Sequence, residues 1–107
     1  MKMPMDLRIR HLDVPDLVAA AWKRRTAIAL RTLASRIRRV TVTVAGETGE
    51  EYEVLCRVRI ETLEGRSLVV SNRSRDAGRA LAMALDSAAR ATHKQVARHR
   101  LERRRAS

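Results

Sequence analysis

The 107 residues of this chain fit one domain of ordinary size and leave little room for a second hydrophobic core. Hydrophobic residues make up 45% of the sequence, but Trp22 and Tyr52 are its only aromatic residues, so the core must be aliphatic. There are 23 lysines and arginines against 12 aspartates and glutamates, which gives a formal net charge of +11. This excess of positive charge favours a polyanionic partner.

An anionic membrane is one such partner, but the sequence does not favour it. No apolar run approaches the roughly 20 residues of a membrane-spanning helix. The N-terminal residues 1–4 lack the apolar stretch of a signal peptide. We therefore expect a cytoplasmic protein that does not use a membrane.

The first third of the chain predicts a strand followed by a helix. Residues 6–10 alternate between apolar and basic side chains, which is the period of a strand with one buried face. Asp13 and Pro15 mark a helix start near Val14, because aspartate caps helices and proline favours their first turn. The helix should run to about Ser35. Its apolar face comprises Val18, Ala19, Trp22, Ala29, Leu30, Leu33 and Ile37.

The middle of the chain predicts three more strands. Valine alternates with polar residues along positions 39–45, where the β-branched composition favours a strand. A link with two glycines follows, and then a long third strand. The residues on its buried side are Tyr52, Val54, Cys56, Val58 and Ile60. A turn at Glu64 and Gly65 leads to a short fourth strand, residues 67–71, which is apolar on both sides and should be covered by its neighbours.

From Arg75 onward the sequence is rich in alanine, leucine and arginine, which predicts a long helix capped by Asn72 or Ser74 and reaching about Leu101. Its apolar stripe comprises Ala77, Leu81, Ala84, Leu85, Ala88, Thr92 and Val96. The opposite face carries Arg75, Arg79, Arg90, His93 and Lys94. Residues 103–107 have no apolar partner, so we expect them to form a disordered basic tail.

The predicted order of elements is therefore β-α-β-β-β-α, with no repeat and no linker. This order predicts an α+β two-layer sandwich, in which a four-stranded, mainly antiparallel sheet carries both helices on one face. Residues 1–102 should form the single domain and residues 103–107 its tail.

The residues that catalysis would need do not converge. His11 follows a strand, while His93 and His99 lie on the second helix among cations that repel metal ions. Cys56 alternates with Val54 and is expected in the core. The phosphate-loop, dinucleotide, zinc-protease and CxxC motifs are absent. We therefore predict no enzymatic activity, no metal, no cofactor and no small-molecule substrate.

The placement of charge indicates phosphate contact instead. Lysine and arginine neutralise phosphates and release counterions, which gives strong binding without base reading. Any single arginine can equally be a solvated side chain, but solubility alone does not require +11. With Tyr52 expected on the buried side, the sheet offers no aromatic side chain for base stacking. Recognition of the shape and phosphates of a duplex-rich RNA remains, and ribosomal RNA is the abundant example. The arginines of the other sheet face are as compatible with solubility as with RNA contact: Arg8, Arg10, Arg39, Arg57 and Arg59.

Three segments and the order of elements carry a resemblance to a known family. They are residues 37–42 (IRRVTV), residues 65–70 (GRSLVV), and Asp76, Ala80 and Leu81 at the start of the second helix, with Asp86 and Arg90 further along. Over nearly the whole chain this combination resembles the ribosome hibernation-promoting factors, also called ribosome-associated translation inhibitors or sigma-54 modulation proteins. The sequence departs from the family at Gly78 and Arg79, where an aromatic residue is common.

The resemblance implies the β-α-β-β-β-α fold and binding to the small ribosomal subunit in the channel used by mRNA and tRNA. Carried over by position, the rRNA-facing residues are Arg79, Arg90, Lys94 and Arg98 of the second helix and Lys23, Arg24 and Arg31 of the first. Together with Arg75 and His93 from the basic helix face, they form the candidate RNA-binding set. The similarity is to the short form without a C-terminal dimerisation domain, which implies a monomer acting on one ribosome by steric occupancy.

Two other functions fit the same charge. One is a general module for double-stranded RNA or the nucleoid, and the other is a non-catalytic adaptor whose basic faces meet an acidic protein. Equal affinity for arbitrary duplexes would favour the first, and insensitivity to nuclease would favour the second. Co-sedimentation with ribosomes would favour hibernation.

Overall fold

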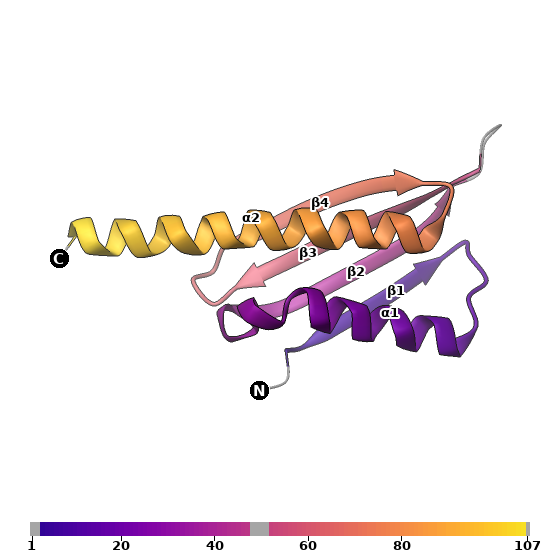
Figure 1. The fold of residues 1–107 in the computed structure, drawn as a ribbon, viewed down its shortest axis with the longest axis horizontal. Coiled ribbons are helices and arrows are strands. Elements are labelled where there is room, and N and C mark those ends of the chain that lie inside the picture. The colour runs from indigo at the N-terminus through magenta and orange to yellow at the C-terminus, as the bar shows by residue number, and fades with distance from the viewer. Residues whose placement is uncertain (1–2, 48–51, 107) are drawn as a thin grey trace.

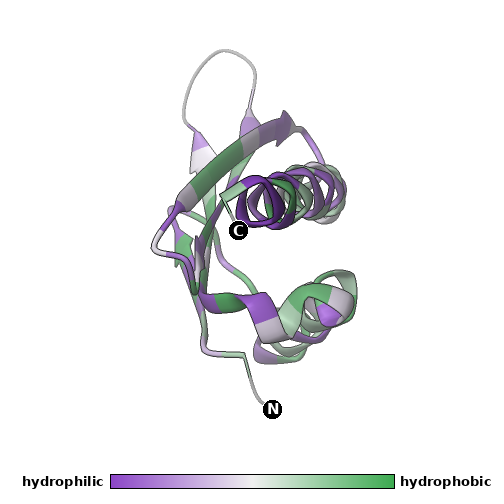
Figure 2. Cartoon of the chain, turned by 90° about the vertical axis from the view of Figure 1, so that its left-hand side faces the viewer, coloured by the Kyte–Doolittle hydropathy of each residue, from purple (hydrophilic) through white to green (hydrophobic). Residues whose placement is uncertain are grey.

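The computed structural model describes residues 3–47 and 52–106 (Figure 1). They form one four-stranded sheet in the order β1-β2-β3-β4, and the helices lie on one face of it (Figure 2). The β1–β2 pair is parallel, and the β2–β3 and β3–β4 pairs are antiparallel. The predicted fold class, an α+β sandwich with a mainly antiparallel sheet, is confirmed.

The strands pair so that their valines and isoleucines meet under the helices. β1 spans Met5–Arg10, β2 Ile37–Glu47, β3 Glu53–Thr62 and β4 Ser67–Ser74. In the β2–β3 register Val42 lies opposite Val58 and Val44 opposite Cys56, and all four side chains are buried. Residues of one strand alternate between the two faces, so the residues between them point to the uncovered side of the sheet.

The helical connection between β1 and β2 is divided in two. α1 spans Asp16–Ala29, and a 3₁₀ helix, η1, spans Arg31–Arg36. The single helix predicted to Ser35 is wrong in this last part. In a 3₁₀ helix residues three apart share one side, so Leu30 and Leu33 both enter the core while the chain descends to the sheet. Ile37, expected on the helix face, is instead the first residue of β2.

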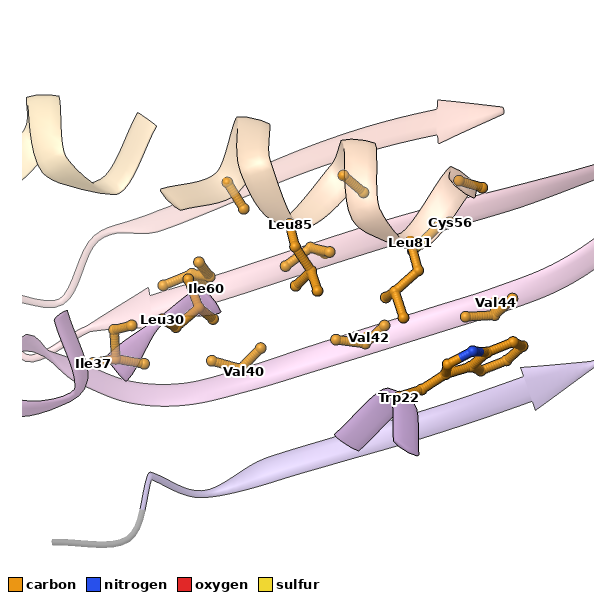
Figure 3. Packing of buried hydrophobic residues seen from close by; sticks show 14 of the residues in the cluster. Trp22, Leu30, Ile37, Val40, Val42, Val44, Cys56, Ile60, Leu81 and Leu85 are labelled. Carbon is orange, nitrogen blue, oxygen red and sulfur yellow. The ribbon is translucent and has the colours of Figure 1, made fainter. Parts of the chain in front are cut away.

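The core is aliphatic, as predicted, and Trp22 is the one aromatic side chain among its buried hydrophobic residues (Figure 3). Leu81 and Leu85 point from α2 toward β2 and β3, and Trp22 points from α1 toward Val44 (Figure 3). Cys56 is fully buried, which confirms its predicted place. Thr26, Ala80 and Thr92 are also buried, and each threonine hydroxyl donates to a carbonyl one helical turn earlier.

Two predictions about burial are wrong. Tyr52 is 49% exposed, because it precedes β3 and lies at the end of the sheet. The buried side chains of β3 begin only at Val54. A Cβ at Gly46 would lie 2.8 Å from the Tyr52 hydroxyl, so the tyrosine folds over this glycine. Val69 is 54% exposed, because β4 is an edge strand with one face uncovered. Alternation sets the side of a residue but not whether anything covers that side.

The second helix, α2, spans Ala77–Ala106. Its cap is Asp76, whose carboxylate accepts the backbone N–H of Arg79 at 3.2 Å, rather than the predicted Asn72 or Ser74. Ser74 instead accepts the N–H of Asp76. Residues 103–106 continue the helix where a disordered tail was predicted, and Ser107 of that tail lies outside the described residues. No residue before Ala106 breaks the helix, and its last turns extend past the sheet (Figure 1).

Within the described residues no helix is both long and apolar enough to cross a membrane.

Candidate nucleic-acid interface

The nine residues of the predicted RNA-binding set are all exposed. They lie on α1, on η1, at the turn before α2 and along α2, which together form the helix layer. They are Lys23, Arg24, Arg31, Arg75, Arg79, Arg90, His93, Lys94 and Arg98. The prediction that these side chains point away from the core is therefore confirmed, while their contact with RNA stays a prediction.

The orientation of α2 decides how its cations are distributed. Leu81, Leu85 and Ala88 face the sheet, and successive residues of an α-helix rotate by about 100°. Arg90 therefore points outward, away from the sheet. The flank of α2 toward α1 is marked by Gly78, whose carbonyl accepts from Arg25 at 3.4 Å. The opposite flank, toward β4, carries Lys94 and Arg98.

This second flank forms a cationic pocket of about 640 Å³ between α2 and the start of β4. Its lining residues are Arg66, Ser67, Leu68, Ala91, Lys94, Gln95 and Arg98. Three of them are cations and none is a carboxylate. We call this site the α2–β4 pocket. A carboxylate oxygen of Glu102 lies 3.7 Å from the guanidinium group of Arg66, but both side chains are more than half exposed, so this pair is weak.

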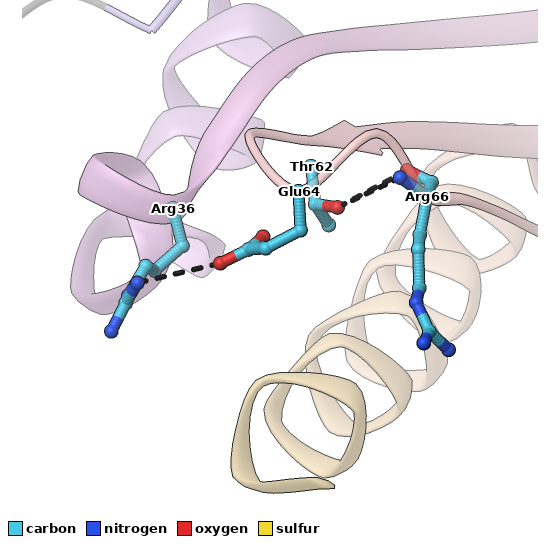
Figure 4. Close-up of polar contacts among 4 residues, drawn as sticks. All are labelled: Arg36, Thr62, Glu64 and Arg66. Atoms are coloured by element: carbon cyan, nitrogen blue, oxygen red, sulfur yellow. Dashed lines mark hydrogen bonds and ion pairs between the residues drawn. The ribbon is translucent and has the colours of Figure 1, made fainter. Parts of the chain in front are cut away.

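The turn between β3 and β4 holds Arg66 in place (Figure 4). The backbone N–H of Arg66 donates to the Thr62 hydroxyl at 3.2 Å, and its carbonyl accepts from the Thr62 backbone N–H at 2.8 Å. Thr62 itself is buried. Gly65 takes the positive φ of 83° that the turn requires, and Arg36 pairs with Glu64 at 3.3 Å on its outer side. A rigid turn thus presents Arg66 to the pocket.

Arg66 is the site residue that the sequence analysis missed. No local period connects it to α2, because Lys94 and Arg98 lie about thirty residues further along the chain. Its sequence signals were its position directly after the turn glycine, Gly65, and its place in residues 65–70, one of the segments that carry the resemblance. The structure brings these cations together because β4 is the edge strand beside α2.

A second cavity, of about 450 Å³, lies between α1 and α2. It is lined by Arg25, Ala29, Ala82, Leu85, Asp86 and Ala89. Its charges are mixed, because both Arg25 and Asp86 line it, and Asp86 also pairs with Arg90 at 3.0 Å across one helical turn. The cationic character of the helix layer is thus partly compensated on this side. Of the nine predicted residues, only Lys94 and Arg98 line either of these two cavities.

Other chemistry has few groups to support it in the described part of the chain. Burial raises the pKa of the Cys56 thiol to about 12, so the thiol stays protonated at neutral pH. No group of three or more His, Cys, Asp or Glu residues that could hold a metal ion is found among the described residues. The helix layer instead offers guanidinium and ammonium groups, which bind phosphate oxygens.

No protein-family model and no curated protein sequence matches this chain. Among solved structures, a ribosomal subunit interface protein from Coxiella burnetii is similar, with a TM-score of 0.73 over 89% of this chain and 99% of that one, at 8% identity. The N-terminal domain of protein Y from Thermus thermophilus is similar as well, with a TM-score of 0.69 over 86% of this chain and 98% of that one, at 15% identity. The chain has the fold of these two proteins. The resemblance predicted from the sequence is therefore confirmed at the level of the fold, which by itself does not decide function.

Proposed function

We propose that this protein is a ribosome hibernation factor that binds rRNA of the small subunit through its helix layer. It inhibits translation by occupying the channel used by mRNA and tRNA, as a cytoplasmic monomer and without catalysis. The observation that carries the proposal is the α2–β4 pocket, where Arg66, Lys94 and Arg98 converge with no carboxylate among the lining residues. The fold shared with a ribosomal subunit interface protein supports the choice of the ribosome as the partner.

The physical basis of binding is electrostatic. Cations that contact phosphates release condensed counterions, so affinity falls with salt, with a log-log slope of several units if roughly 5 to 8 phosphates are engaged. Among the described residues the helix layer carries no exposed Phe, Tyr or Trp for base stacking, so we infer that the protein recognises the RNA backbone and shape. Such binding is reversible, and it leaves the rRNA chemically unchanged.

Co-sedimentation with purified small subunits over a salt series tests the partner. We expect steep loss of binding as salt rises and weaker binding to large subunits at every salt concentration. A salt slope near zero would contradict the proposal. Equal affinity for arbitrary duplexes would identify a general duplex-binding module, and capture that survives nuclease would identify a protein adaptor.

An in vitro translation assay tests the mechanism. Inhibition should scale with the fraction of ribosomes bound, and a high-salt wash should restore activity, because salt removes electrostatic contacts. Inactivation that persists after the wash, or cleaved or modified rRNA, would contradict steric occupancy and indicate an enzyme.

A further inference from the structure

The face of the sheet opposite the helices is uncovered (Figure 2) and carries its own basic centre. The strand register arranges its side chains in rows that cross the sheet. The central row runs Arg8, Thr43, Arg57, Ser71 across all four strands. The next row runs Arg10, Ala45, Leu55, Arg73. These two rows contain four arginines and no carboxylate.

The carboxylates of this face lie in the flanking rows, where they pair with other arginines. The Oδ2 atom of Asp6 lies 3.6 Å from the Nη1 atom of Arg39, and the Oε1 atom of Glu61 lies 3.6 Å from the Nη2 atom of Arg59. At the end of the sheet where β2 finishes, the Glu47 carboxylate lies 3.2 Å from the Nε atom of Arg73, a residue of the second row. Glu53 lies opposite Glu47 in the strand register. The five arginines that the sequence could not rank thus separate into two paired ones and three others.

Those three are Arg8, Arg10 and Arg57. All are exposed, and within residues 3–47 and 52–106 none has an ion pair or hydrogen bond from its side chain. Arg8 and Arg57 flank Thr43, so their Cα atoms lie about two strand spacings, or roughly 10 Å, apart. A nucleic-acid duplex presents negative charge every few ångströms along its axis, so one duplex can meet all three guanidinium groups.

The central row suits double-helical RNA in particular. It alternates guanidinium groups with the hydroxyls of Thr43 and Ser71, and neither this row nor the next contains an aromatic side chain for base stacking. The minor groove of an RNA duplex is wide and shallow, and it displays 2′-hydroxyls between its phosphates. A flat sheet face with alternating donors fits such a surface better than it fits splayed single-stranded bases.

This face and the α2–β4 pocket belong to opposite layers of a thin molecule, whose shortest extent is 17 Å. A straight duplex that contacts the helix layer cannot also contact the open sheet face. We propose that the open face of the sheet is a second RNA-binding surface, centred on Arg8, Arg10 and Arg57, so that the protein bridges two RNA segments. This inference rests on the proposed function, and it adds to it a second contact with the same class of partner.

Bridging is measurable with two populations of an RNA duplex of about 16 base pairs, one labelled with a donor dye and one with an acceptor. The wild-type protein should give energy transfer that is maximal at one protein to two duplexes and falls with excess protein. The variant Arg8→Gln with Arg57→Gln should lose this transfer while it still binds one duplex, and its log-log salt slope for small-subunit binding should fall by about 2.

The matched control is Arg39→Gln with Arg59→Gln, which removes the same formal charge from the same face but from arginines held in ion pairs. It should keep energy transfer near the wild-type level. Circular dichroism melts of all three proteins check that they are folded, and Arg8→Lys with Arg57→Lys should retain bridging.

The possible failures are distinguishable. If the wild type binds neither duplex nor small subunits, the proposed function fails and the bridging inference fails with it. If it binds a duplex only one to one, or if both glutamine variants lose transfer equally, the second surface is refuted while binding through the helix layer stands.

Discussion

The two faces of this sandwich are both basic, but they hold their charges in different ways. On the helix layer, Lys94 and Arg98 project from a helix into a pocket whose third cation, Arg66, is fixed by a hydrogen-bonded turn. On the sheet face, arginines lie in flat rows, and the register decides which of them meet a carboxylate. The comparison teaches that exposure alone does not identify an anion site: the positions of neighbouring carboxylates decide the local charge.

The largest expected effect comes from destabilising the hydrophobic core, on which both faces depend. Leu81 is fully buried between α2 and the sheet. Leu81→Ala should lower the free energy of unfolding by about 2–5 kcal/mol, because it removes buried methyl groups and leaves a cavity. Thermal and urea denaturation measure the loss. Met83→Ala, at an exposed position of the same helix, is the control and should change stability little.

The next effect separates the two faces. Lys94→Glu with Arg98→Glu should weaken binding to small subunits on the order of 100-fold, because two cations of the α2–β4 pocket become repulsive toward phosphate. The melting temperature should stay near that of the wild type, because exposed charges contribute little to folding. The control is Arg103→Glu with Arg105→Glu, which makes the same change of charge in the last helical turn, outside the pocket. Equal losses for both variants would mean that net charge, and not the pocket, sets affinity.

A smaller change tests whether the rigid turn matters. Thr62→Val removes the hydroxyl that bonds the backbone of Arg66 and should cost about 1 kcal/mol of stability. It should also weaken small-subunit binding a few-fold, because Arg66 is less firmly held. Thr26→Val removes a buried hydroxyl of α1 that donates to the Trp22 carbonyl, and it lies outside both cavities. The prediction fails if the two variants bind alike.

The smallest expected effect concerns the buried thiol of Cys56 and the pH dependence of stability, and it changes no residue of either basic face. Burial raises the Cys56 pKa from 9.0 to about 12, so above pH 9 the unfolded chain releases a proton that the folded protein keeps. Stability from this group is complete below pH 9 and is lost as pH rises from about 9 toward 12. Cys56→Ala should show a shallower fall of melting temperature over this range. Parallel curves for the two proteins would show that the thiol does not contribute.

Much of the fold could be predicted because its signals are local. The alternation of Val40, Val42 and Val44 indicates a strand with one buried face, and the structure buries all three. The stripe of Leu81, Leu85 and Ala88 indicates which side of α2 meets the sheet. Errors occurred where one element ends against another: at Leu30, where the α-helix gives way to a 3₁₀ helix, and at Tyr52, where the sheet extends beyond its cover.

The sequence by itself determined the net charge, the aliphatic core, the order of elements and the exposure of the nine candidate RNA-binding residues, because side-chain periodicity along one helix or strand is set by its backbone geometry. Only the tertiary structure decided that Arg66 joins Lys94 and Arg98. It also decided that Arg39 and Arg59 are paired while Arg8, Arg10 and Arg57 have no partner among the described residues. These outcomes depend on strand register and on the packing of α2 beside β4. Both are relations between segments distant in the chain, and no local period encodes them.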